Sequence, residues 1–112
     1  MKSNIAKRWI KALRSGLYKQ GTEQLKNANN EYCCLGVLCD LHSKSTGKKW
    51  HSNLYLGSFA TAPITVAKWA GMKEQNADGY IKSGASLTEL NDNRQYSFKQ
   101  IARAIERNIK HL

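Results

Sequence analysis

The longest apolar run in this 112-residue chain is the stretch from Cys33 to Cys39, inside the string EYCCLGVLCDLH of residues 31–42. It is far shorter than the roughly 20 apolar residues that a membrane-spanning helix needs. A chain of this length buries one hydrophobic core. The run must therefore lie in that core, with the more polar segments packed around it. We predict a single domain over residues 1–112, without membrane association.

The two ends of the chain predict amphipathic helices. The first begins with Ser3 as the expected N-cap and stops at Ser15-Gly16. The last begins at Ser97, which has the S-x-x-Q spacing of a capping box with Gln100. The apolar faces are Ile5, Ala6, Trp9, Ile10, Ala12 and Leu13 in the first helix, and Phe98, Ile101, Ala102, Ile105 and Ile109 in the last. Each helix also has a basic face: Lys7, Lys11 and Arg14 in the first, and Lys99, Arg103, Arg107 and Lys110 in the last.

Shorter elements are expected between these ends. Helices are predicted from about residue 35 to Gly47, and from Pro63, capped by Thr61 or Ala62, to Gly71. SLTELND (86–92) predicts one helical turn. Strands are expected at 22–27 and 31–34, joined by the asparagine-rich turn NANN, with further short strands at 48–50 and, in a loop over 72–86, at 79–82. The predicted fold class is α+β, with about four helices packed around a small antiparallel sheet.

The cysteine-rich segment permits three interpretations. A zinc site would need about four ligands, and Cys33, Cys34, Cys39 and His42 are available. Neighbouring cysteines in an extended segment point in opposite directions, which disfavours a shared ion. A nucleophilic Cys34 would gain from the positive end of the following helix, but no base is placed beside it by sequence. Free cysteine is among the most buried residue types, so we favour packing, with neither a metal nor a cofactor.

Several of these segments carry motifs that resemble those of one protein family. The string YCCLGVLCDL follows W-x3-L-R-S-G-x-Y-x-Q (residues 9–20) and precedes G-K-x-W, W-A-G, L-T-x-L-N-D and S-F-x-x-I-A-x-x-I. In this order the motifs resemble a family of small uncharacterised proteins of phages and prophages, and they cover nearly the whole chain. Ala62-Pro63 departs from the leucine-proline expected there. The resemblance brings no catalytic residues. It implies an accessory protein acting in the host cytoplasm during infection.

The formal net charge of +10 predicts an anionic partner. Residues 1–26 alone hold seven Lys or Arg and one Glu. Three cysteines, an odd number, are typical of a reducing compartment, and the N-terminus lacks the apolar block of a signal peptide, so we expect a cytoplasmic protein. The four carboxylates that a hydrolase could use are scattered and have no paired spacing: Glu31, Asp40, Glu89 and Asp92. An enzyme is therefore the less favoured interpretation.

Two candidate binding sites follow from the charge pattern. In one, Lys48 and Lys49 stand beside Trp50 and His51, a combination that suits a base plus a phosphate. The simpler alternative is that Trp50 is a core residue and the lysines are solvated. In the other, the terminal helices pack side by side, and Lys7, Lys11 and Arg14 merge with Arg103, Arg107 and Lys110 into one phosphate-binding surface.

Three functions stay open at this point. The first is capture of a small anionic ligand, a nucleotide signal of host defence, in a deep pocket or at the subunit interface of a homo-oligomer. The second is nucleic-acid binding without sequence specificity, through phosphate contacts along the terminal helices. The third is an adaptor that inhibits an acidic host protein through an apolar patch rimmed by charge.

Overall fold

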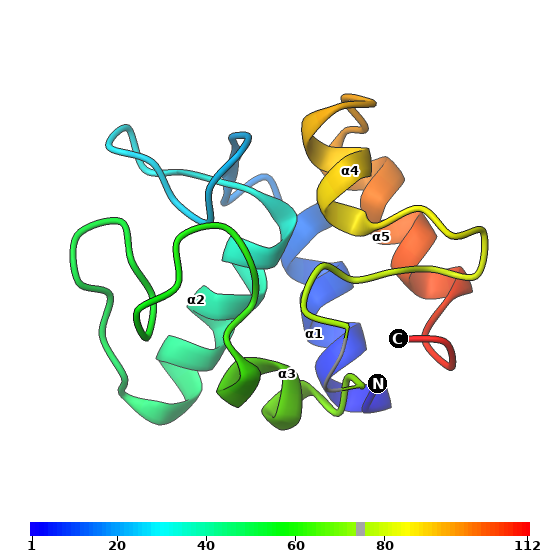
Figure 1. Ribbon diagram of the computed structural model, residues 1–112, viewed down its shortest axis with the longest axis horizontal. Coiled ribbons are helices and arrows are strands. Elements are labelled where there is room, and N and C mark those ends of the chain that lie inside the picture. The colour runs from blue at the N-terminus through cyan, green and yellow to red at the C-terminus, as the bar shows by residue number, and fades with distance from the viewer. Residues whose placement is uncertain (74–75) are drawn as a thin grey trace.

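The computed structural model describes residues 1–73 and 76–112. In this part of the chain the helices are α1 (Ser3–Arg14), α2 (Cys34–Thr46), α3 (Ile64–Ala70), α4 (Leu87–Asp92) and α5 (Phe98–Arg107), and the strands are β1 (Lys19–Gln20) and β2 (Glu31–Tyr32). α2 stands between α1 and the long loop of residues 47–63, with α3 across its C-terminal end (Figure 1). The predicted α+β class is confirmed, with five helices in the described residues where about four and a helical turn were expected.

The helix ends follow local chemistry in most places. Ser97 and Gln100 form the predicted capping box, since each side chain bonds to the other residue's backbone N–H. Gly47 and Gly71 end α2 and α3 in the left-handed conformation, at φ of 80° and 73°. The N-caps of α1 and α3 were predicted wrongly. Lys2 precedes α1 without a side-chain cap, and Pro63 itself precedes α3.

The predicted antiparallel sheet is wrong. β1 and β2 pair in parallel, with Lys19 opposite Glu31 and Gln20 opposite Tyr32. The 22–27 segment makes one antiparallel bridge, between Lys26 and Tyr32. Its Leu25 is fully buried and donates its N–H to the carbonyl of Phe59, so this segment passes into the core and cannot continue a ladder.

The other strand predictions are also wrong. Residues 48–50 form no strand, and His51 bridges Leu54 across a tight turn instead. Tyr80 makes one isolated bridge to Ser86 in place of a strand at 79–82. Most of the predicted 72–86 loop is confirmed as irregular backbone, and its residues 74–75 lie outside the described part.

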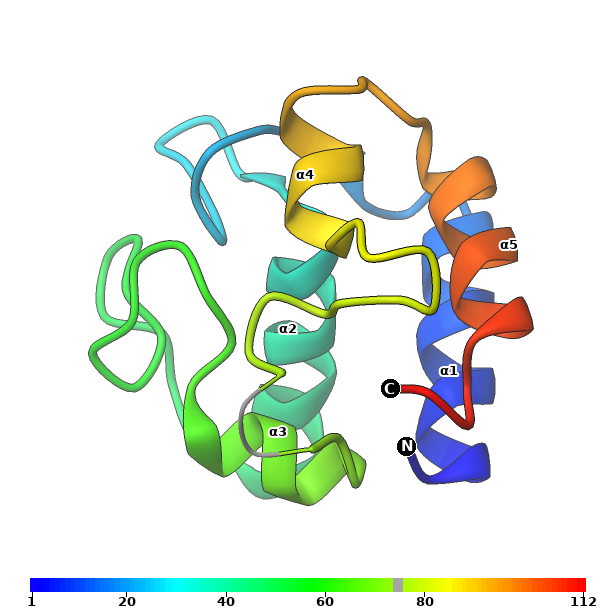
Figure 2. The same ribbon diagram turned by 45° about the vertical axis from the view of Figure 1, so that its right-hand side comes forward.

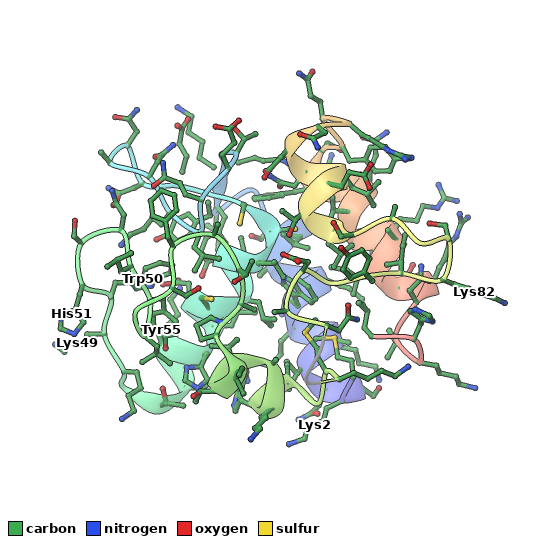
Figure 3. The ribbon with its side chains drawn as sticks, in the orientation of Figure 1. Lys2, Lys49, Trp50, His51, Tyr55 and Lys82 are labelled. Carbon is green, nitrogen blue, oxygen red and sulfur yellow. The ribbon has the colours of Figure 1, made fainter. Side chains whose placement is uncertain are left out.

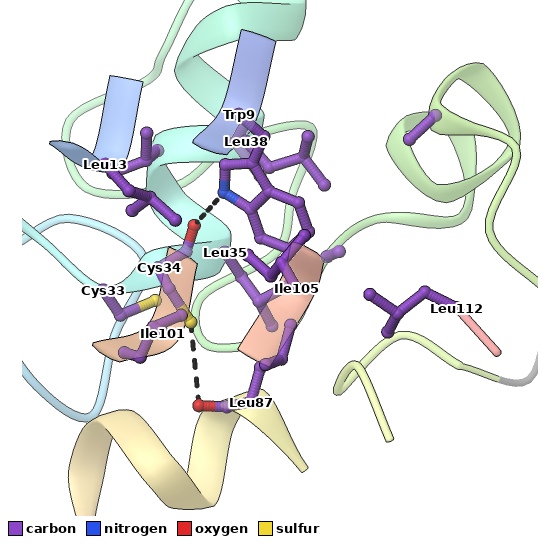
Figure 4. Packing of buried hydrophobic residues seen from close by; sticks show 14 of the residues in the cluster. Trp9, Leu13, Cys33, Cys34, Leu35, Leu38, Leu87, Ile101, Ile105 and Leu112 are labelled. Atoms are coloured by element: carbon purple, nitrogen blue, oxygen red, sulfur yellow. Dashed lines mark hydrogen bonds between the residues drawn. The ribbon is translucent and has the colours of Figure 1, made fainter. Parts of the chain in front are cut away.

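The apolar run from Cys33 to Cys39 lies at the centre of the core, as its sequence predicted. Trp9 of α1 is fully buried and donates its indole N–H to the carbonyl of Cys34 at 2.9 Å (Figure 4). Leu87 of α4 and Ile101 of α5 pack around the same turn of α2. The first turn of α2 is thereby surrounded by three helices.

α1 and α5 make the most extensive contact between any two of these elements. They lie side by side and antiparallel, with α5 on the outer surface of the molecule (Figures 1 and 2). Their apolar faces contribute Trp9, Ile101 and Ile105 to the core, so their opposite faces are turned to solvent. Within the described residues, none of the helices has the length and apolar character that crossing a membrane requires.

Candidate functional site

The packing of α1 against α5 brings the basic faces of the two helices together. We call the following five exposed side chains the terminal-helix face: Lys7, Lys11, Arg14, Lys99 and Arg103. Arg14, Lys99 and Arg103 line a shallow depression of about 480 Å³ between the helices. Lys7, Lys11 and Arg14 line a second one of about 520 Å³. Because Arg14 belongs to both, the two depressions form one continuous basic surface.

One carboxylate interrupts this surface. Glu106 of α5 lines both depressions and forms an ion pair with Arg14, at 3.4 Å between Arg14 Nη1 and Glu106 Oε2. Both side chains are about half exposed, so the pair contributes little to stability. Its main effect is to reduce the positive potential of the surface. Arg107 and Lys110, which the sequence placed on the same surface, line neither of these depressions and border a neighbouring one instead.

The second predicted site does not assemble around Trp50. Lys48, Lys49 and His51 are exposed, and Lys49 and His51 lie on an outer loop (Figure 3). Trp50 turns inward from them, toward Tyr55, at 4.9 Å between ring centroids. Lys26 covers the Trp50 ring at 4.5 Å, and the indole N–H donates to Asp40 at 3.1 Å. The face that a base would need is thus occupied by contacts within the chain.

Asp40 lies at the centre of an aromatic cluster that consists of Tyr18, Tyr32 and Trp50. Its carboxylate accepts hydrogen bonds from the Tyr18 hydroxyl and the Trp50 indole, and it pairs with Lys44 at 3.4 Å. Burial, followed by the hydrogen bond to Asp40, raises the pKa of Tyr18. Tyr32 contacts both Tyr18 and Trp50 edge to face. Asp40 therefore holds side chains from three segments in place, which is a structural role.

The cysteines are core residues, as the packing interpretation predicted. Cys33, Cys34 and Cys39 are all buried with free thiols. Burial raises the pKa of Cys33 to about 11 and also raises the pKa of Cys34 and of Cys39. A protonated, inaccessible thiol is a poor nucleophile. Across residues 1–73 and 76–112, no three His, Cys, Asp or Glu side chains are arranged to hold a metal ion.

Sequence reasoning missed a third depression, on the other side of α5. It has a volume of about 560 Å³, and its polar lining includes Arg94, Tyr96, Arg103 and Arg107. Arg94 and Tyr96 lie in the irregular segment between α4 and α5, where no periodicity marks a functional position. The only sequence signal was an arginine and a tyrosine two residues apart, just before the capping box of α5.

The fold and this surface define a small α+β protein whose two terminal helices present a basic face. The chain belongs to the family described as Domain of unknown function (DUF8296), whose model matches residues 1–109. Searches of curated proteins and of solved structures gave no match.

Proposed function

We propose that this protein binds nucleic acid through the phosphate backbone, without sequence specificity, and that the terminal-helix face is the binding surface. The observation that carries the proposal is the side-by-side packing of α1 and α5, which joins basic residues more than 80 positions apart into one surface. Lysine and arginine on such a surface contact successive phosphates and release counterions.

A backbone ligand fits this surface better than a captured mononucleotide does. The depressions between α1 and α5 are shallow and have no aromatic residue among the described residues that line them, whereas a mononucleotide pocket encloses most of its ligand. The aromatic residue that the sequence suggested for such a pocket, Trp50, is covered by Lys26. The resemblance to phage proteins supports an accessory role in the cytoplasm of an infected host cell, acting by binding.

Charge-reversal variants test the proposal directly. We expect Arg14→Glu/Arg103→Glu to weaken binding of a labelled 20-nucleotide DNA at least about tenfold at 100 mM salt. The slope of log affinity against log salt should fall by about 2, because two phosphate contacts are lost. Lys48→Glu/Lys49→Glu makes the same change in net charge on the outer loop and is the matched control. Binding is followed by fluorescence anisotropy, and folding by circular dichroism.

A substitution of Glu106 should change the affinity for DNA in the opposite direction. Glu106→Gln removes the carboxylate that pairs with Arg14, so we expect tighter DNA binding and a steeper salt dependence.

Equal weakening by both charge-reversal pairs would show that net charge alone drives binding and would overturn the assignment of the surface. If the protein binds no DNA and binds a nucleotide or a host protein instead, the proposed function is wrong.

A further inference from the structure

The depression beside Tyr96 differs from the terminal-helix face in having an aromatic ring among its cations. Its lining includes Arg94, Arg103 and Arg107, together with the half-buried Tyr96. Among the described residues, no carboxylate lines it. Arg94 makes an exposed ion pair with Glu89 at 3.5 Å, so Arg103 and Arg107 are the cations that remain to meet an anionic ligand there.

Tyr96 is half-buried, packs against the core and lines the depression with the rest of its surface, whereas three other rings each have a cation over one face. Arg8 lies over Trp69, Lys26 over Trp50 and Lys44 over Tyr18, at 4.5 to 5.7 Å from the ring centroids. Tyr96 has neither a cation nor a second ring stacked on it within the described part of the chain. Its hydroxyl also makes no hydrogen bond to the described residues. An external planar group would therefore meet the part of the Tyr96 ring that lines the depression.

The backbone of Tyr96 is held from two sides. Its N–H donates to the carbonyl of Leu90 in α4 at 2.9 Å, and its carbonyl accepts from the side chain of Gln20 in β1 at 2.8 Å. The preceding Gln95 has φ of 53°, a left-handed conformation that a non-glycine residue adopts at some cost. The backbone that carries the ring is thus fixed before any ligand arrives, which lowers the entropic cost of binding.

Arg103 connects this depression to the terminal-helix face, because it lines both. A nucleic acid whose phosphates lie along α1 and α5 would reach Tyr96 at the α5 edge. Bases in a duplex are paired and stacked inward, so only an unpaired base can turn toward a protein ring. The surface of α5 thus places cations for the backbone beside a depression that an aromatic ring lines, and these are the two parts of a single-strand binding site.

We propose that Tyr96 stacks an unpaired base, and that the protein binds single-stranded nucleic acid in preference to duplex. This inference rests on the proposed function. Phosphates occupy the terminal-helix face, and one base enters the depression lined by Arg94, Arg103 and Arg107. The base contact adds affinity that does not depend on salt, since it involves no counterion release.

The experiment compares three variants on two ligands of equal nucleotide number, a 20-nucleotide single strand and a 10-base-pair duplex, each strand carrying a 5′-phosphate so that the phosphate numbers are also equal. We expect Tyr96→Leu to lose about tenfold in affinity for the single strand, with an unchanged salt slope and unchanged duplex affinity. Tyr96→Phe keeps the ring and should retain single-strand binding. Tyr80→Leu is the matched control, because Tyr80 is exposed and does not line the depression. A single strand carrying 2-aminopurine should lose fluorescence on binding to the unaltered protein but not to Tyr96→Leu.

The possible outcomes distinguish a failure of this inference from a failure of the proposed function. If both ligands bind, and Tyr96→Leu and Tyr80→Leu behave alike with 2-aminopurine fluorescence unchanged, the stacking site is wrong and backbone binding stands. If duplex binds as tightly as single strand to the unaltered protein, the stated preference is wrong. If neither ligand binds at low salt, the proposed function fails and this inference fails with it. Thermal unfolding of each variant shows whether a loss comes from misfolding.

Discussion

Gly36 shows how one residue fixes the path of a distant segment. A Cβ atom at this position would lie 1.8 Å from the carbonyl oxygen of Leu25, so only glycine lets the 22–27 segment cross α2. The neighbouring backbone is itself tied, since Cys33 donates its N–H to the same Leu25 carbonyl. The apolar run is therefore interrupted by glycine for a reason of close approach and not of flexibility.

We expect Gly36→Ala to destabilise the protein by about 3 kcal/mol or more, because a backbone segment must move to accept the methyl group. Gly47→Ala, at the C-terminal end of the same helix, is the matched control. Gly47 has φ of 80°, and no described atom lies within 4 Å of the place that a Cβ would take, so its cost should be only about 1 kcal/mol. Urea unfolding measures both values. Similar costs for the two variants would contradict the close approach.

His42 predicts a pH dependence of stability. It is buried, its Nδ1 lies 2.6 Å from the Tyr55 hydroxyl, and its ring contacts Trp69. Burial, with a smaller effect of Lys48, lowers the pKa of His42 below 6.5 in the folded state. The unfolded chain therefore takes up the proton at a higher pH than the folded protein does.

The contribution of His42 to the free energy of unfolding is therefore fully present above about pH 6.5. It decreases as the pH drops through that value toward the lowered pKa of the folded state. The free energy of unfolding should be smaller at pH 5.5 than at pH 7.5. His42→Gln should reduce stability at pH 7.5 and also flatten this dependence, whereas His51→Gln, on an exposed residue, should leave it in place. If the free energy of unfolding of His42→Gln still depends on pH in this range, another titratable group causes the dependence.

At the scale of elements, α5 forms because its start is specified locally. The Ser97 hydroxyl accepts from the N–H of Gln100, and the Gln100 side chain accepts from the N–H of Ser97. These bonds satisfy backbone donors that have no partner within the helix. α5 supplies Lys99 and Arg103 to the terminal-helix face, so its capping box also positions these two side chains.

We expect Ser97→Ala to lower the free energy of unfolding by about 1 kcal/mol through loss of this cap. Ser3→Ala should change it by less than about 0.5 kcal/mol, because Ser3 lies inside α1 and makes no capping bond. The pair is measured by chemical denaturation under one set of conditions. An equal loss in both variants would mean that hydroxyl removal, and not capping, causes the effect.

At the scale of the whole molecule, one buried amide joins the N-terminal segment to the C-terminal half. Asn91 accepts hydrogen bonds from the Gln20 side chain at 2.9 Å and from the Cys34 N–H at 3.3 Å. It donates to the carbonyl of Gly21 and to Asp92, which in turn accepts from the N–H of Glu23. This network satisfies groups that would otherwise be buried without a partner, and none of the described buried side-chain polar atoms lacks one.

Asn91→Leu should therefore cost about 3 kcal/mol, because it leaves several buried polar groups without partners. Asn29→Ala, on an exposed asparagine of the NANN turn, is the control and should stay within about 0.5 kcal/mol. A double-mutant cycle of Asn91 with Gln20 should give a coupling energy near about 1 kcal/mol. Additive effects of the two changes would show that the Asn91 network does not stabilise the fold.

The sequence determined the features that depend on neighbours along the chain. The amphipathic faces of α1 and α5, the capping box at Ser97, the left-handed ends at Gly47 and Gly71, and the burial of the cysteine run were predicted because their physical causes are local. Periodicity places a side chain on a face, and a cap needs residues only three positions apart.

Only the tertiary structure decided the features that depend on distant partners. β1 pairs in parallel with β2 because Gln20 is anchored to Asn91 and because Leu25 enters the core beside Gly36. Trp50 joins the Asp40 cluster, and Tyr96 faces an open depression, through contacts that no local pattern encodes. The physical reason is the same in each case: irregular backbone takes its direction from hydrogen bonds and packing to remote segments, and these exist only once the helices have packed.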